Sequence, residues 1–237
     1  MLLEVCANSL ASALNAQLGG AGRVELCENL KEGGTTPCPS SIMMARKLLK
    51  IPLFVLIRPR TGDFLYDDLE FDQMKEDIIF CKGQGIQGVV FGILKPDGSI
   101  DMDRNAELIR LAHPLQVTFH RAFDMASNAF QALEDIISLG IDAKHSNEDQ
   151  IAPFERWIEL YNDRIGLFGG IDVNTLCLKS YDDVFREVLE NGTEYRRKTN
   201  GYGIGSGNSI PGYVPVEGFQ AMIDAVKEIR KREENRS

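Results

Sequence analysis

The sequence has 237 residues, 43% of them hydrophobic and 26% charged, and its net charge is −9. This composition is ordinary for a globular protein, and a chain of this length can bury a core without disulfide or metal staples. The acidic balance argues against a nucleic-acid partner, and no run approaches the ~20 apolar residues of a membrane helix, which argues against a membrane partner.

The chain starts without the cationic and apolar regions of a signal peptide, and its five cysteines lack a paired spacing. Both features are typical of a reduced, cytoplasmic protein. From there on, strand-like runs alternate with amphipathic helical segments, and no linker-like stretch divides them. The expected strands are Leu3–Ala7, Arg23–Cys27, Leu53–Arg58, Gly88–Leu94, Gln116–Arg121, Ile141–His145, Arg164–Ile171 and Gly201–Gly205. The expected helices cover residues 9–20, 40–50, 68–85, 103–112, 128–140, 150–163, 180–192 and 216–234.

Local signals mark several helix boundaries. Ser9 and Asn128 are expected to cap helix starts. Four glycines are expected to close helix ends: Gly19, Gly85, Gly140 and Gly192. Eight strands alternating with eight helices predict an α/β fold, a single-domain (β/α)8 barrel spanning residues 1–237. A doubly wound open sheet is the alternative, although no G-x-G-x-x-G follows the first strand.

Function in such a barrel resides at the C-terminal ends of the strands. Cys6 and Cys27 occupy similar positions in the first two strands, and their sulfur atoms would favour Cu(I) or Zn. Alternatively, each is a small core residue. Cys38 adds a third thiol in the loop that follows.

Charged side chains also fall on the inner faces of the expected strands. Glu4 and Glu25 would be costly to bury unpaired. Four arginines can neutralise them: Arg23, Arg58, Arg60 and Arg121. The set is either a structural ion network or a binding site for a small anionic ligand.

His120 is the best candidate for a general acid or base, because it is expected at a strand end beside Arg121 and Asp124. The predicted catalytic set is Glu4, Glu25, His120, Arg121 and Asp124. A hydrogen-bonded structural histidine is the alternative interpretation of His120.

Glycine-rich loops follow the last two strands, at residues 169–170 and 203–207. Barrels often bind phosphate through backbone N–H groups at these two loops. Gly170 and Gly205 are therefore candidate ligand-binding residues, with turn glycines as the alternative.

Residues 1 to about 140 resemble the CutC family through "LEVCANSLASALNAQLGGAGRVELCENLKEGGTTP", "LIRPRTGDFLY" and "VTFHRAFDM". The resemblance implies a (β/α)8 barrel associated with copper homeostasis and Cu(I) binding through cysteine. It also implies that one set of residues lines the conserved end of the barrel: Glu4, Cys6, Arg23, Glu25, Cys27, Arg58, His120, Arg121 and Asp124.

Residues from about 140 to 230 instead resemble the C-terminal part of uroporphyrinogen decarboxylase-like proteins, a superfamily that includes corrinoid-linked methyltransferases. The motifs are "GIDAKHSNEDQIAPFERWIELYNDRIGLFGGIDVNTLC" and "YGIGSGNSIPGYVPVEGFQAMIDAV". We expect neither a zinc site nor decarboxylase activity, because the N-terminal catalytic half is missing and Asn208 replaces a cysteine. Asp172, Ser206 and Asn208 are the residues of this portion that could still bind a ligand.

The two resemblances predict a chimeric barrel with five CutC-like strands, three decarboxylase-like strands and a junction within Leu139–His145. Engineered recombination is the leading explanation of its origin, and natural recombination is the second. Three functions remain open: a CutC-like Cu(I)-binding protein with reduced or no native activity, a barrel enzyme for a phosphorylated or carboxylated small molecule, and an inactive folding scaffold. The protein is expected to be a monomer or homodimer without demonstrable enzyme activity and with no cofactor other than Cu(I).

Overall fold

Parallel strands and helices alternate along the chain in the computed structural model, which describes residues 1–145, 151–206 and 213–235. The strand order in the described residues is that of a closed barrel, β1 to β8 in sequence. The strands are β1 (Leu2–Ala7), β2 (Arg23–Leu26), β3 (Leu53–Leu56), β4 (Gly88–Phe91), β5 (Gln116–Phe119), β6 (Ala143–Lys144), β7 (Gly166–Ile171) and β8 (Tyr202–Ser206). The predicted (β/α)8 barrel is thus confirmed, and the doubly wound open sheet is wrong.

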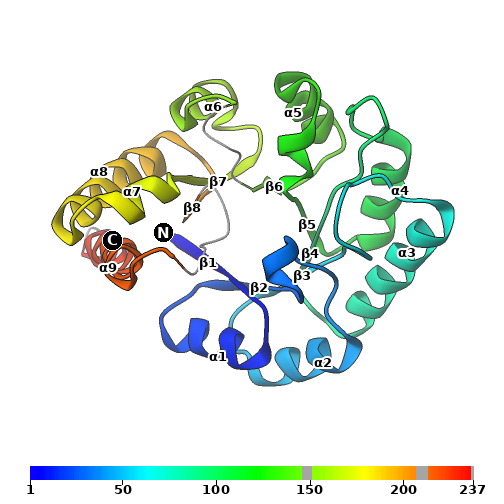
Figure 1. Ribbon diagram of the computed structural model, residues 1–237, viewed down its shortest axis with the longest axis horizontal. Coiled ribbons are helices and arrows are strands. Elements are labelled where there is room, and N and C mark those ends of the chain that lie inside the picture. Colours follow the sequence, from blue (N-terminus) through cyan, green and yellow to red (C-terminus); the bar gives the residue numbers. More distant parts are fainter. Residues whose placement is uncertain (146–150, 207–212, 236–237) are drawn as a thin grey trace. The chain divides into compact units, whose positions relative to one another are not determined.

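The helices follow the strands as the alternation predicts (Figure 1). They are α1 (Leu10–Leu18), α2 (Pro39–Leu48), α3 (Asp68–Gly83), α4 (Met102–Ala112), α5 (Ala129–Ser138), α6 (Phe154–Tyr161), α7 (Val173–Leu178), α8 (Tyr181–Lys198) and α9 (Val216–Glu234). Two short 3₁₀ helices, η1 (Leu30–Glu32) and η2 (Arg121–Met125), follow β2 and β5. The sequence did not indicate α7, which lies between β7 and the long α8.

Two predicted N-caps are confirmed. The Ser9 side chain accepts the N–H of Ser12 at the start of α1, and the Asn128 side chain accepts the N–H of Gln131 at the start of α5. Each bond satisfies one of the N–H groups that a helix start leaves without an intrahelical partner. These two polar residues therefore set where the helices begin.

Gly192 was expected to end a helix, and this prediction is wrong. Helix α8 continues through Gly192 to Lys198. A β-carbon at Gly192 would lie 2.9 Å from Ile229 Cδ1 and 3.0 Å from Ile204 Cδ1. The glycine therefore allows close packing of α8 against α9 and β8, and it does not mark a helix end.

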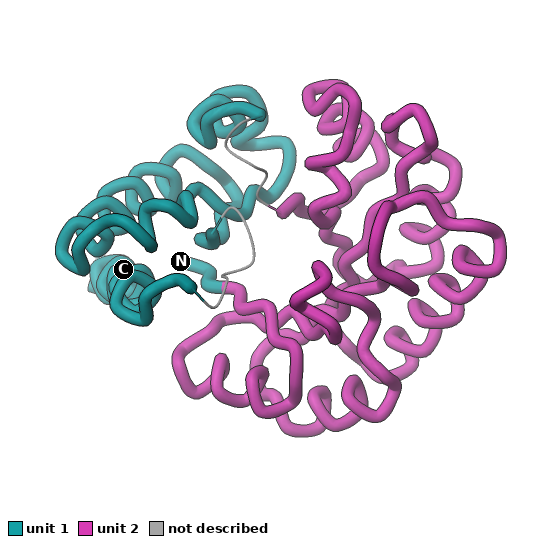
Figure 2. The backbone as a smooth tube through the Cα atoms, viewed as in Figure 1, with its two compact units in different colours: residues 1–3, 146–237 teal, residues 4–145 magenta. Residues whose placement is uncertain are grey.

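The chain divides into two compact units, which Figure 2 colours separately. One comprises residues 1–3 and 146–237, and within it β7 pairs in parallel with β8, which also pairs with Leu2 and Leu3. The other comprises residues 4–145. We call this second part the N-terminal unit.

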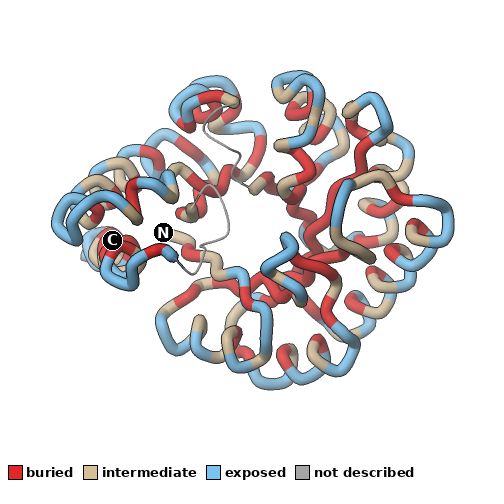
Figure 3. Tube along the Cα trace, viewed as in Figure 1, coloured by how far each residue is buried: buried red, intermediate tan, exposed pale blue. Residues whose placement is uncertain are grey.

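Within the N-terminal unit, β1 to β6 form consecutive parallel pairs. Helices α1 to α4 lie on one face of these strands (Figure 1), and their buried sides face the sheet while their exposed sides face solvent (Figure 3). The strand residues of β2, β3 and β4 are all buried. We call the sheet face turned away from the helices the inner face.

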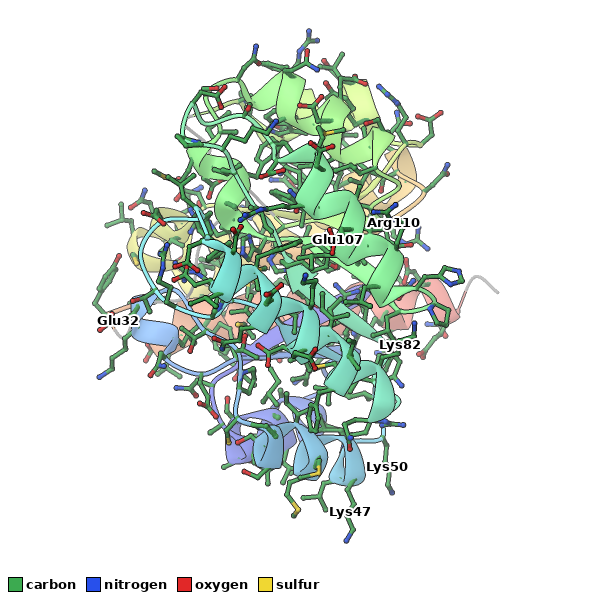
Figure 4. All side chains as sticks on the ribbon, turned by 90° about the vertical axis from the view of Figure 1, so that its right-hand side faces the viewer. Glu32, Lys47, Lys50, Lys82, Glu107 and Arg110 are labelled. Atoms are coloured by element: carbon green, nitrogen blue, oxygen red, sulfur yellow. The ribbon has the colours of Figure 1, made fainter. Side chains whose placement is uncertain are left out.

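The outer surface of α2, α3 and α4 carries charges of both signs, as the labelled side chains of Figure 4 show. Lys75 of α3 lies 3.6 Å from Glu107 of α4, and Lys82 donates to the carbonyl of Leu111. Mixed charge of this kind is a solvated helix surface and not a basic nucleic-acid stripe. Among the described residues, none of the helices has both the length and the apolar character needed to cross a bilayer.

Candidate functional site

The polar side chains predicted to form a site in the N-terminal unit share the inner face because of strand register. Glu4 of β1 lies opposite Arg23 of β2, and Cys6 lies opposite Glu25. Side chains two residues apart on a strand share a face, so these four project together. The Arg23 guanidinium lies 3.8 Å above the ring of Phe54 on β3 and packs against it.

The last two strands of the unit add a histidine to this face. His145 directly follows β6 and lies two residues beyond Ala143, which pairs with Thr118 of β5. Its N–H donates to the carbonyl of Phe119 at 2.9 Å. The alternation that turns Ala143 inward therefore turns the imidazole of His145 inward as well.

Four charged groups meet there. His145 Nε2 lies 3.1 Å from Glu25 Oε2 and 3.3 Å from Glu4 Oε1. The other oxygen of Glu4 accepts the Nε–H of Arg23. The side chains of Glu4, Glu25 and Arg23 are each less than a tenth exposed. Two carboxylates are thus balanced by one guanidinium and one imidazolium, as burial requires.

These contacts shift two pKa values in opposite directions. Burial alone would lower the pKa of His145, but the charge of Glu25 and hydrogen bonds to Glu25 and Glu4 raise it to about 10. Burial alone would raise the pKa of Glu4, but the hydrogen bond to His145 and the charge of Arg23 lower it. The imidazole is therefore protonated at neutral pH and the carboxylate of Glu4 is ionised.

The two thiols predicted to lie together do so. Cys6 Sγ is 3.6 Å from Cys27 Sγ and 3.6 Å from Glu25 Oε1. Cys27 is buried and also lies 3.7 Å from the carbonyl oxygen of Ala7. A hydrogen bond with Cys27 and the negative charges of Glu25 and Glu4 raise the pKa of Cys6 well above its usual range, although the residue itself is exposed. Cys6 is thus a protonated thiol unless a metal ion displaces its proton.

His120 lies on the same face, but its chemistry differs from the predicted role. Burial and the charges of Arg58 and His145 lower its pKa to about 3, so the ring is neutral. Its Nδ1 accepts the N–H of Ala122, which places the ring proton on Nε2. Within the part of the chain that the structure describes, Nε2 has no hydrogen-bond partner. A base this weak is poorly matched to proton transfer at neutral pH, so its catalytic role stays a prediction.

The remaining predicted arginines contact the protein itself. Arg58 donates to the carbonyls of Gly34 at 2.9 Å and Gly62 at 2.7 Å, and so fixes two loops. Arg60 pairs with Asp63 and Glu70. A guanidinium occupied in this way is less available to an anionic ligand than the sequence indicated.

Arg121 and Asp124 form a local pair within η2, with Arg121 Nε 2.6 Å from Asp124 Oδ2. The pair spans three residues of the same short helix. It therefore stabilises the turn after β5, and a catalytic role for either residue stays a prediction.

The other candidate ligand residues belong to the second unit. Asp172 caps α7 by accepting the N–H of Asn174 at 2.8 Å. Gly170 has a φ of +92°, and a β-carbon there would lie 3.0 Å from Phe154 and Tyr195. The Asp172 cap and the close packing at Gly170 both serve the fold. Gly205 differs from Gly170, because a β-carbon at Gly205 would meet nothing within 4 Å. Asn208 lies outside the described residues.

His145 and Lys144 are the residues that sequence reasoning missed. Side chains alternate between the two faces of a strand, so His145 shares the inner face with Ala143, two residues before it. This rule would have placed His145 on the same face as the carboxylates. Lys144 pairs with Phe119 on the face toward the helices, and its Nζ lies 4.3 Å above the ring of Phe123. Burial lowers the pKa of Lys144 to about 7.

The strand order places the chain in the class of parallel (β/α)8 barrel proteins, with carboxylates, an imidazole and two thiols on the inner face of its N-terminal unit. A family model described as the CutC family matches residues 1–179. The chain belongs to the CutC family.

Individual relatives agree with this assignment. A CutC family protein of Bacteroides fragilis is 38% identical over 245 residues, which cover 97% of this chain and 94% of that protein. The human copper homeostasis protein cutC homolog is 50% identical over 141 residues, or 60% of this chain. The chain spans 52% of the human relative, about half of its length.

A solved structure of CutC from Streptococcus agalactiae has a TM-score of 0.69 and 28% sequence identity with this chain. The match covers 89% of this chain and all of that one. It agrees with the barrel described above.

In these comparisons the similarity to the CutC family continues beyond the junction expected at residues 139–145. Both the family model and the Bacteroides relative pass through residues 139–145. They add no support for a decarboxylase-like second portion. Residues 1–179 at least therefore belong to one family, where the motifs had indicated a change near residue 140.

Proposed function

We propose that the protein binds Cu(I) through Cys6 and Cys27 as part of a role in copper homeostasis. The 3.6 Å separation of their sulfur atoms carries the proposal, because Cu(I) prefers soft sulfur ligands and two thiols at this distance can share one ion. The human relative is described as a copper homeostasis protein. In this role copper is the cargo of the protein.

Copper uptake at these thiols exchanges a proton for the metal ion. The thiol of Cys6 lies against Glu25 Oε1, a carboxylate that can accept its proton. Because metal binding requires the thiolate, the raised pKa of Cys6 makes copper uptake release a proton. Copper affinity should therefore rise with pH.

Titration of Cu(I) against a competing chelator tests the proposal. We expect about one tightly held Cu(I) per chain in the unmodified protein, and loss of that equivalent in the Cys6→Ser/Cys27→Ser variant. Cys38→Ser is the matched control, because Cys38 lies at the start of α2, where its thiol contacts Ser40 and Ser41. Equal stoichiometry in the unmodified protein and the double variant would contradict the proposal.

A recombined origin is retained as a second proposal. The match to the human relative covers 141 residues, whereas the match to the Bacteroides relative covers 97% of the chain and continues past His145. A recombined origin does not affect the copper proposal, because both cysteines lie within the N-terminal unit.

A further inference from the structure

We propose that Glu4, Glu25 and His145 form a second metal site, which takes a divalent transition-metal ion of the Zn²⁺ type. This site goes beyond the Cu(I) proposal, since it uses oxygen and nitrogen atoms and neither of the two thiols. All three residues belong to the N-terminal unit.

The three side chains come from three strands and converge on one point. Glu4 Oε1, Glu25 Oε2 and His145 Nε2 all lie within 4.8 Å of one another. Both carboxylates approach the same ring nitrogen, at 3.3 and 3.1 Å. A single N–H cannot point directly at two acceptors. A metal ion at the centre of the three atoms would displace the Nε2 proton to solvent and bond to all three atoms.

The spacing between the imidazole and each carboxylate also suits zinc. Zinc bonds to nitrogen and oxygen of about 2.0–2.2 Å place neighbouring ligands of a tetrahedral site about 3.3–3.5 Å apart. The two distances from His145 Nε2 are within about 0.2 Å of the lower end of this range. Three protein ligands leave the fourth position for water or a small molecule, as in catalytic zinc sites.

The ligand atoms, two carboxylate oxygens and one imidazole nitrogen, distinguish this site from the two-thiol copper site. Imidazole nitrogen favours zinc and similar ions over Mg²⁺ and Ca²⁺, and carboxylate oxygen is too hard a ligand for Cu(I). Arg23 holds the second oxygen of Glu4, which turns Oε1 toward His145. Such an outer contact orients a ligand, and its loss typically weakens metal binding 10–100-fold.

Zinc titration with a competing chelator, at neutral pH on the 237-residue chain, tests this site. We expect one Zn²⁺ per chain and a loss of affinity of more than about 100-fold in a Glu25→Gln/His145→Gln variant. This variant removes one negative and one positive charge together and leaves the Arg23–Glu4 pair in place, so it should remain folded. Circular dichroism verifies its fold before titration.

Two variants make the outcome independent of the copper site. Cys27→Ser should abolish Cu(I) binding and leave Zn²⁺ affinity unchanged. His145→Gln, which keeps Glu25 beside the thiol of Cys6, should weaken Zn²⁺ binding and leave Cu(I) binding unchanged. If the unmodified chain takes up no Zn²⁺, or if the folded Glu25→Gln/His145→Gln variant binds it equally well, the group is a hydrogen-bonded ion pair only and the proposal is overturned. Loss of Zn²⁺ in Cys27→Ser alone would assign the zinc to the thiols and would also overturn it.

Discussion

His145→Ala is expected to lower the free energy of unfolding by about 3–5 kcal/mol at pH 7, the usual effect of breaking a buried ion pair. The substitution leaves the buried carboxylate of Glu25 without the cation that lies 3.1 Å away. Glu4 retains Arg23, so the effect arises mainly at Glu25. Denaturant unfolding of both proteins at pH 7 measures the difference.

The pH dependence of this difference gives a sharper result. The pKa of His145 is raised from 6.5 to about 10 in the folded protein. The contribution of the imidazolium is therefore complete below about pH 6.5 and is lost as the pH rises toward 10. The unmodified protein and His145→Ala should thus converge in stability between pH 7 and 10.

A matched variant separates charge from packing. Glu25→Gln in the His145→Ala background removes the unpaired carboxylate and should recover part of the lost stability. A loss below about 1 kcal/mol in His145→Ala, or a loss that is constant from pH 7 to 10, would show that the pair contributes little.

Acid is expected to destabilise the protein through His120, by about 3 kcal/mol between pH 6.5 and 4. Burial and the positive charges of Arg58 and His145 lower the pKa of His120 from 6.5 to about 3. The unfolded chain takes up a proton in this window and the folded chain does not. Stability therefore falls as the pH falls from 6.5 toward 3.

His120→Asn isolates this effect from that of the carboxylates. The asparagine oxygen can still accept the N–H of Ala122, which His120 Nδ1 accepts at 3.2 Å, but it does not titrate. The variant should have a shallower loss of stability between pH 6.5 and 4. Identical pH slopes for both proteins would show that His120 is protonated normally in the fold.

The sequence predicted the barrel because its strands and helices have a clear hydrophobic period. Buried runs such as Leu53–Leu56 and Gly88–Phe91 appear almost where expected, and polar caps such as Ser9 set helix starts. These are local signals, and each depends on a few neighbouring residues. The predicted proximity of Cys6 and Cys27 is also confirmed, because adjacent parallel strands fix it.

The partners of the polar side chains could not be predicted in the same way. Arg58 was assigned to an anionic ligand, but it contacts loop carbonyls up to 26 residues away in sequence. His145 contacts Glu4 across the inner face, and only the register of all the strands brings the two together. Gly192 failed as a helix end because helix packing, and not local sequence, requires a glycine there.

X-ray absorption at the copper edge of the Cu(I)-loaded protein tests whether the inner face carries a two-sulfur copper site. We expect two sulfur neighbours in both the unmodified protein and Cys38→Ser, and fewer in either Cys6→Ser or Cys27→Ser. Copper bound only by nitrogen and oxygen, or a sulfur count that changes with Cys38 and not with Cys6 or Cys27, would contradict the two-sulfur site.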